Sequence, residues 1–274
     1  MIPHNKAIII GLSILLLLLF CALFAPQLAP IAPNQMNYRH RMQLPSWSHP
    51  FGTDFFGRDI LSRTLYGSRI ALLVGTLAVA LALAPGLLLG LIAGYRRGWA
   101  DTAIMHVMDA LLSFPGLLLA IAMITVLGPG HWQATFSIAI VFIPGFARVV
   151  RGQVLIVRAE DYVQAAIALG ASDAAIIRRH ILPNVMGPLI VQTTASFANA
   201  ILMEAGLSFL GLGTQPPVAS WGVMLQEART FMDLQPWAAI LPGAALALAV
   251  LGFNLFGDGL RDALDPRFRP RMMR

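Results

Sequence analysis

The sequence is poor in charged residues and has a single cysteine. Charged side chains make up 12% of the 274 residues and apolar ones 57%, and the mean hydropathy is +0.72. Soluble domains carry roughly 25% charged residues, so this composition excludes an ordinary soluble domain and predicts an integral membrane protein. Because Cys21 has no second cysteine to pair with, an internal disulfide and a cluster of thiolate metal ligands are excluded too.

Lysine is almost absent as well, and this excludes a common kind of nucleotide site. Lys6 is the only lysine and no glycine-rich segment precedes it, whereas a phosphate-binding loop needs the pattern G-x-x-x-x-G-K-[ST]. The sequence also lacks an H-E-x-x-H zinc motif and a G-x-S-x-G nucleophile elbow, since Ser208 lies in GLSFL. We therefore expect no catalytic residue, no metal site and no cofactor bound by this chain.

The net charge of +6 does not indicate a nucleic-acid partner. The basic residues are dispersed between apolar stretches rather than gathered in one patch. Residues placed in this way orient a membrane protein and face anionic lipid. We expect contact with membrane lipid and no binding of nucleic acid.

Six apolar stretches have about the length, ~20 residues, that crosses a bilayer as a helix. They are residues 7–24, 70–94, 102–127, 133–149, 189–210 and 237–256. We therefore expect an all-α integral membrane protein with six transmembrane helices. It forms one domain, residues 1–274, with residues 70–260 as its core.

The N-terminal part is expected to hold an anchor and an external loop. Residues 1–24 are interpreted as a retained anchor helix, because the apolar run is long for a signal peptide and no small-x-small cleavage site follows. Residues 25–69 are polar and rich in proline and glycine, which favours a loop. The end of that loop, residues 59–66, has the pattern of a short amphipathic helix lying at the membrane interface.

The distribution of basic residues orients the chain through the positive-inside rule. If the N-terminus is cytoplasmic, thirteen of the nineteen Lys and Arg residues lie on the cytoplasmic side and six on the outer side. Both termini are then cytoplasmic, and residues 261–274 form a cytoplasmic tail. The segment 161–184 faces the cytoplasm too.

Residues 161–184, DYVQAAIALGASDAAIIRRHILPN, are the longest segment that is both helix-prone and charged. We call this segment the hairpin. A first helix can end at Gly170 in a left-handed conformation, Ser172 can cap a second helix, and Pro183 is expected to close it. A partly apolar and partly charged hairpin between two membrane spans needs a partner surface on one side of the membrane.

Several spans contain helix breakers. Proline–glycine pairs predict kinks, which suit helices that line a path or change shape. Small residues at four-residue spacing, such as Gly86 and Gly90, instead indicate close packing of helices. The proline–glycine pairs begin at Pro85, Pro115, Pro144 and Pro242.

Four ionisable residues lie in or near the spans, where burial of a charge costs at least ~2.5–3.5 kcal/mol. Asp109 is expected to pair with an arginine such as Arg148. Arg148 and Asp258 lie near cytoplasmic ends of spans, where their side chains can reach water, so these three residues are interpreted as structural. Glu204 lies in the outer half of the fifth span, and two roles stay open for it: facing an internal path or an external gate, or making a structural hydrogen bond.

Stretches along nearly the whole chain resemble one known family. QAAIALG at 164–170, followed by HILP at 180–183, resembles the cytoplasmic EAA loop of the permease subunits of binding-protein-dependent ABC importers. Three further stretches resemble the dipeptide, oligopeptide and nickel branch of that family, and its dipeptide permeases above all. They are HPFGTDFFGRDILSRTLYGSR (49–69), EAGLSFLGLGTQPPVASWG (204–222) and FNLFGDGLRDALDPR (253–267).

The resemblance implies a type I ABC importer permease fold in the cytoplasmic (inner) membrane of a bacterium. The chain would form half of a pathway with a homologous second permease subunit, while two ATPase subunits bind ATP and Mg and an external solute-binding protein delivers the solute. The hairpin would contain the coupling helix that contacts an ATPase. The implied solute is a di- or oligopeptide, with nickel or a metal chelate as the alternative; a secondary transporter and a multi-pass membrane enzyme are more distant alternatives.

Residue roles follow from the same resemblance. The family motif has glutamate where this chain has Gln164, so a charged contact with the ATPase would become a neutral one. In an alternating-access mechanism the hairpin would act as a lever on the kinked spans. The residues expected to contact the ATPase are Gln164, Ala165, Ala166, Leu169, Gly170, Ala171 and Pro183. The candidates for the pathway or its gate are Glu204, Ser208, Phe209, Gly211 and Trp221.

Overall fold

A computed structural model describes residues 4–264, so most of the expected tail, residues 261–274, lies outside the described residues. The described part of the chain is helical and contains no β-strand. Its α-helices are α1 (His4–Leu23), α2 (Ala25–Leu28), α3 (Ile60–Arg96), α4 (Gly98–Leu112), α5 (Gly116–Leu127), α6 (His131–Arg158), α7 (Asp161–Ala168), α8 (Asp173–Ile176), α9 (Leu182–Phe209), α10 (Trp221–Arg229) and α11 (Trp237–Leu264). Tyr38–His40 form a 3₁₀ turn and Ile177–Ile181 a π-helical turn.

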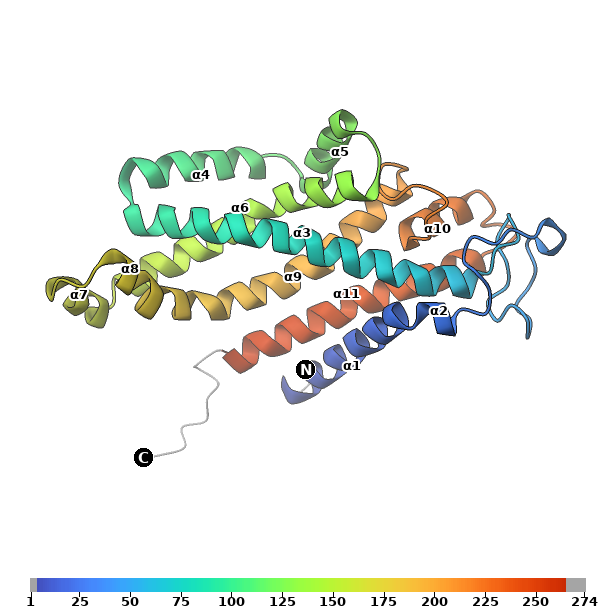
Figure 1. Cartoon of the computed structure of the whole chain (residues 1–274), viewed down its shortest axis with the longest axis horizontal. Helices are drawn as coiled ribbons and strands as arrows, with labels where there is room; N and C mark the ends of the chain where they lie inside the picture. Colours follow the sequence, from blue (N-terminus) through green and yellow to red (C-terminus); the bar gives the residue numbers. More distant parts are fainter. Residues whose placement is uncertain (1–3, 265–274) are drawn as a thin grey trace.

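The long helices lie side by side in an elongated bundle (Figure 1). The hairpin, with α7 and α8, projects from one end of this bundle. The loop before α3 lies at the other end, together with α10. α1 runs toward the loop end and α11, beside it, runs back toward the hairpin end. The two ends of the bundle therefore present different segments to their surroundings.

Five helices among the described residues are long and apolar enough to cross a membrane, and the bent pair of α4 and α5 makes up to a sixth. This count agrees with the six spans expected. The third expected span, residues 102–127, is broken rather than continuous, because the axes of α4 and α5 differ by 89°. Pro115 lies at the break; proline disfavours a helical conformation in the preceding residue, Phe114, and cannot donate a backbone hydrogen bond.

Helix α3 begins earlier than the sequence suggested. Asp59 caps it, since its Oδ2 accepts hydrogen bonds from the backbone N of Ser62 at 2.7 Å and from Ser62 Oγ at 2.8 Å. The helix then continues without interruption for 37 residues. The expectation of a separate interfacial helix at 59–66 is therefore wrong. Gly67 lies inside the helix and lets the indole of Trp221 approach closely: a Cβ there would be 2.6 Å from Trp221 Cδ1.

Glycine residues let α3 lie directly against α6. A Cβ atom on Gly86 would come within 2.4 Å of Phe146 Cβ, and one on Gly90 within 2.6 Å of the carbonyl oxygen of Ala147. Any larger residue at these positions would push the two helices apart. Small residues at helix contacts are the usual means of close approach in membranes, where no hydrophobic effect drives helices together. The predicted close packing at Gly86 and Gly90 is confirmed.

Candidate functional site: the hairpin and a cavity between helices

The first helix of the hairpin, α7, ends in a Schellman motif. The backbone N of Ala171 donates to the carbonyl oxygen of Ala166 at 3.1 Å, and that of Gly170 donates to Ile167 at 2.9 Å. Gly170 has φ +81°, the left-handed conformation that this motif requires and that glycine adopts at least cost. The predicted end of the first helix at Gly170 is confirmed.

The second helix of the hairpin begins as predicted but does not end at Pro183. Ser172 caps α8 by accepting a hydrogen bond from the backbone N of Ala175 at 3.4 Å. A π-helical turn follows, in which the backbone N of Leu182 donates to the carbonyl oxygen of Ile177, and α9 starts there. Pro183 therefore stands in the first turn of α9, where a backbone N–H is not needed. The prediction that Pro183 closes the helix is wrong.

The hairpin has a buried side and an exposed side. Val163, Ile176 and Ile181 are fully buried and belong to the main core. On the other side Leu169 is 89% exposed and Tyr162 is 49% exposed. Ala165, Gly170 and Ala171 are exposed beside Leu169. Large apolar side chains exposed at the tip of a projecting segment mark an interaction surface.

Gln164 holds the hairpin to α6. Its side-chain Nε2 donates to the carbonyl oxygen of Arg158, at the end of α6, at 2.6 Å. The last carbonyl groups of a helix lack partners within the helix, and the Gln164 amide supplies one. A carboxylate cannot donate this hydrogen bond. This hydrogen bond gives a structural reason for a neutral glutamine at position 164. The side-chain amide of Gln164 is directed toward the protein's own backbone.

A second tie joins the hairpin to α3. The hydroxyl of Tyr95 donates to Oδ1 of Asp173, the first residue of α8, at 2.7 Å. The guanidinium carbon of Arg158 lies 4.7 Å from the centroid of the Tyr95 ring, and Arg158 Nη1 donates to the carbonyl oxygen of Tyr95. The ends of α3 and α6 and the start of α8 thus meet at these three side chains.

Two ion pairs join α4 to α6. Arg148 Nη2 lies 2.6 Å from Asp109 Oδ1, so the structure brings together the two residues that the sequence analysis paired. Arg151 contacts Asp101 through two parallel hydrogen bonds, of 2.6 and 2.7 Å, a geometry that arginine and carboxylate favour. The third structural candidate, Asp258, lies exposed on α11.

A cavity of about 570 Å³ lies between α5, α6 and α9. Its polar side chains are Gln192, Ser196 and Asn199, which follow one another at helical spacing on one face of α9 and are all uncharged. Pro115, at the break between α4 and α5, precedes the lining residue Gly116, and Pro144, inside α6, precedes the lining residue Gly145. The cavity is lined by Leu112, Gly116, Leu117, Val141, Phe142, Gly145, Gln192, Ser196, Asn199, Leu202, Met203 and Gly206.

The predicted gate residues lie elsewhere, around the end of α9. Glu204 is 1% exposed, and its Oε1 accepts hydrogen bonds from Ser208 Oγ at 2.7 Å and Thr214 Oγ1 at 2.8 Å. Trp221 Nε1 donates to the carbonyl oxygen of Thr64 at 2.9 Å. These contacts fold the segment after α9 onto α3. None of the five predicted gate residues lines the cavity of 570 Å³. They are Glu204, Ser208, Phe209, Gly211 and Trp221.

The polar stripe on α9 is what the sequence analysis missed. Gln192, Ser196 and Asn199 occupy positions i, i+4 and i+7 in an otherwise apolar span, a spacing that places them on one helix face. Glu204, the ionisable residue of this span, bonds instead to Thr214 in the segment between α9 and α10. A search for uncharged polar residues at helical spacing would have found the stripe.

The fold is that of a type I ABC importer permease. The chain matches a subunit of the methionine ABC transporter MetNI in an inward-facing conformation, with a TM-score of 0.57 over 74% of this chain and 96% of that one, at 19% identity. It also matches an amino acid ABC transporter solved with histidines, with a TM-score of 0.58 over 74% and 94% of the two chains, at 17% identity.

Sequence comparison gives the family. A family model described as binding-protein-dependent transport system inner membrane component matches residues 86–270, and one described as N-terminal TM domain of oligopeptide transport permease C matches residues 4–45. The chain belongs to this family of bacterial ABC transport permeases. It is therefore a transport subunit and not an enzyme, and the ATPase of the importer is a separate subunit. The alternatives of a secondary transporter and a membrane enzyme are excluded.

Similar proteins cover nearly the whole chain. The dipeptide transport system permease protein DppC of Alkalihalophilus pseudofirmus is 48% identical over 98% of this chain and 88% of its own length. The di/tripeptide permease protein DppC of Pseudomonas aeruginosa is 46% identical over 97% and 90%. The glutathione transport system permease protein GsiD of Pectobacterium atrosepticum is 46% identical over 97% and 88%.

Proposed function

We propose that this chain forms half of the translocation pathway of an ATP-driven importer for short peptides and couples that pathway to an ATPase through the hairpin. The observation that carries the coupling role is the exposed Leu169 on a segment tied to both α3 and α6. The partners are a homologous second permease subunit, two ATPase subunits that bind ATP and Mg, and an external solute-binding protein. Both termini face the cytoplasm, as the distribution of Lys and Arg favours.

Two hydrogen bonds at the base of the hairpin can transmit its movement to the membrane-spanning helices. Closure of the two ATPase subunits moves the hairpin, the Tyr95–Asp173 hydrogen bond passes this movement to α3, and Gln164 passes it to α6 through the carbonyl of Arg158. Helix α6 contains Pro144, next to the cavity residue Gly145. A rotation of α6 against α5 and α9 then changes the size of the cavity. This process is alternating access by rigid-body movement.

The lining of the cavity supports a peptide as the solute. Amide and hydroxyl groups such as those of Gln192, Ser196 and Asn199 can hydrogen-bond to peptide N–H and C=O groups whatever the side chains of the peptide are. The lining contains no histidine, cysteine or carboxylate that would favour nickel. The names of the curated relatives, which are dipeptide, di/tripeptide and glutathione permeases, support the same solute class.

A transport assay with two asparagine variants tests the pathway. The whole importer is reconstituted in proteoliposomes and ATP-dependent uptake of a labelled dipeptide is measured. Asn199→Leu, which removes a polar group from the cavity, is expected to lower uptake at least several-fold. Asn254→Leu is the matched control, because Asn254 is exposed on α11 and does not line the cavity. Equal uptake by both variants and the native chain contradicts the assignment of the cavity to the pathway.

A further inference from the structure

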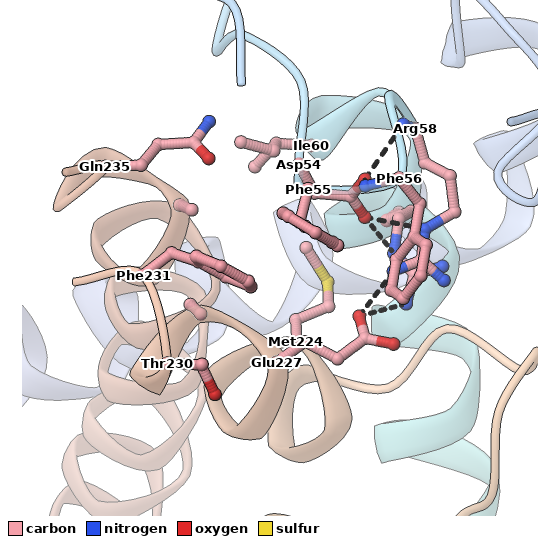
Figure 2. A pocket seen from close by; sticks show the side chains of 13 residues that line it. Asp54, Phe55, Phe56, Arg58, Ile60, Met224, Glu227, Thr230, Phe231 and Gln235 are labelled. Atoms are coloured by element: carbon pink, nitrogen blue, oxygen red, sulfur yellow. Dashed lines mark hydrogen bonds and ion pairs between the residues drawn. The ribbon is translucent and has the colours of Figure 1, made fainter. Parts of the chain in front are cut away.

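A second cavity, of about 280 Å³ (Figure 2), lies near α10, at the end of the bundle away from the hairpin (Figure 1). It is formed between the loop that precedes α3 and the helix α10 with the segment after it. It shares no lining residue with the cavity of 570 Å³. Its lining residues are Asp54, Phe55, Phe56, Arg58, Ile60, Arg63, Met224, Glu227, Ala228, Thr230, Phe231, Gln235 and Ala238.

Asp54, Arg58 and Glu227 stand on one side of this cavity (Figure 2), and a second arginine, Arg63, contacts Glu227. Arg58 Nε donates to Asp54 Oδ2 at 2.6 Å, and Arg58 Nη2 donates to Glu227 Oε2 at 2.6 Å. Glu227 Oε2 also accepts a hydrogen bond from Arg63 Nη2 at 3.1 Å. The formal charges of these four groups cancel. The net charge of this cluster is therefore zero. Any preference of the cavity for a ligand comes from hydrogen-bond donors that have no acceptor in the protein.

The hydrogen-bond donors of this cavity that lack an acceptor belong to Arg63. The residue is 1% exposed, yet its Nε and Nη1 atoms have no hydrogen-bond partner among the described residues. The nearest carboxylate oxygen to Nε is Asp54 Oδ2, at 3.8 Å, which is beyond hydrogen-bond distance. A buried donor without an acceptor is unfavourable, so a ligand that brings an acceptor is favoured. A carboxylate is the acceptor that a guanidinium group binds best.

The remaining walls of the cavity are apolar. The rings of Phe55 and Phe231 are stacked, with centroids 4.2 Å apart and planes 8° from parallel, and Ile60 and Met224 lie beside them. Thr230 is exposed and lines the same cavity, so it lies at the opening. At about 30 Å³ per water in the liquid, the cavity of about 280 Å³ has room for about nine waters, so it can hold a small organic molecule.

We propose that this cavity binds a small carboxylic acid with an apolar body. The carboxylate accepts hydrogen bonds from the free N–H groups of Arg63, and the apolar body packs against Phe55, Phe231 and Met224. Compact polyanions such as phosphate are disfavoured, because the walls are apolar and both carboxylates line the cavity. The site is separate from the proposed pathway, and a ligand bound here does not need to be the transported solute.

Calorimetric titration of the purified importer, containing the full chain and no ATP, tests the ligand class. The probes are N-acetyl-leucine, its neutral amide N-acetyl-leucinamide, and inorganic phosphate. N-acetyl-leucine is expected to bind at least tenfold more tightly than either of the other two. Equal binding of the acid and the amide overturns the carboxylate assignment, and the absence of binding by N-acetyl-leucine overturns the proposal in favour of a cavity that holds water only.

Three variants locate the site. Thr230→Trp closes the opening without touching the arginines, and Arg63→Gln removes the free guanidinium donors; each is expected to weaken N-acetyl-leucine binding at least tenfold. Thr230→Ser is the matched control and should bind as the native chain does. Unchanged binding by Thr230→Trp overturns the proposal even if Arg63→Gln fails to fold. Asn199→Leu should leave this binding intact, so loss of peptide uptake in that variant bears on the pathway and not on this site.

Discussion

Tyr95, near the end of α3, donates a hydrogen bond of 2.7 Å to Asp173, the first residue of α8 and 78 residues further along the chain. A hydrogen bond to a charged acceptor contributes about 1.5–3 kcal/mol. This contact joins the projecting hairpin to a helix that crosses the membrane. A force applied to the hairpin therefore reaches α3 directly.

Removal of that hydroxyl should uncouple transport from ATP hydrolysis. Tyr95→Phe keeps the ring that Arg158 covers and deletes the hydrogen bond to Asp173, so the ATPase subunits should still co-purify while dipeptide uptake per ATP hydrolysed falls several-fold. Tyr66→Phe, at the other end of the same helix, is the matched control and should couple normally. An unchanged ratio of uptake to hydrolysis in Tyr95→Phe contradicts the transmission through α3.

Restoring the glutamate of the family motif should loosen the hairpin of this chain. Gln164→Glu replaces the donor to the Arg158 carbonyl with a carboxylate that repels it, at a cost of about 1 kcal/mol. Amide hydrogen exchange over residues 158–170 should become faster. Ala165→Glu places the same charge on the neighbouring exposed residue and should leave exchange nearly unchanged. If both variants exchange alike, the hydrogen bond of Gln164 does not hold the hairpin.

Substitution of Gly170, at the end of α7, should abolish the coupling of transport to the ATPase subunits without preventing membrane insertion. A Cβ on Gly170 meets no atom within 4 Å, so the cost of Gly170→Asp comes from its left-handed backbone alone, roughly 1–2 kcal/mol. We expect loss of uptake and weaker co-purification of the ATPase subunits.

Gly128→Asp is the control for this strain. Gly128 has φ +85°, and a Cβ there would also meet no atom within 4 Å, but it lies between α5 and α6 and outside the hairpin. It should lose at least as much stability, because φ +85° with ψ 162° is a conformation that essentially only glycine adopts, and it should still retain the ATPase subunits. Loss of ATPase in both variants would show that backbone strain alone accounts for the effect.

Features that depend on a few neighbouring residues could be predicted from the sequence. Gly170 and Ser172 were predicted correctly because the left-handed turn and the helix cap depend on a few neighbouring residues. Pro183 was misread because its effect depends on where the next helix starts. The segment 59–66 was misread because a change from polar to apolar residues does not show whether one helix, here Ile60–Arg96, continues through it.

The residues that line the cavity of 570 Å³ were harder to predict for a related reason. Which face of α9 points into the cavity is decided by how α5 and α6 pack beside it. Glu204 and Asn199 lie close together on the same helix, yet Asn199 lines the cavity whereas Glu204 bonds to Ser208 and Thr214. The sequence indicates that polar residues are present in the span, and tertiary packing decides which of them face the cavity.

The most direct test of the account is the affinity of the ATPase subunits for the membrane subunits after removal of the exposed leucine of the hairpin. Leu169→Ser should weaken this affinity by about tenfold or more, because burying a leucine side chain at an interface contributes roughly 1.5–3 kcal/mol. Leu234→Ser is the matched control, since Leu234 is 70% exposed but lies outside the hairpin. The account predicts weakened binding for Leu169→Ser alone; unchanged affinity, or an equal loss in both variants, would contradict it.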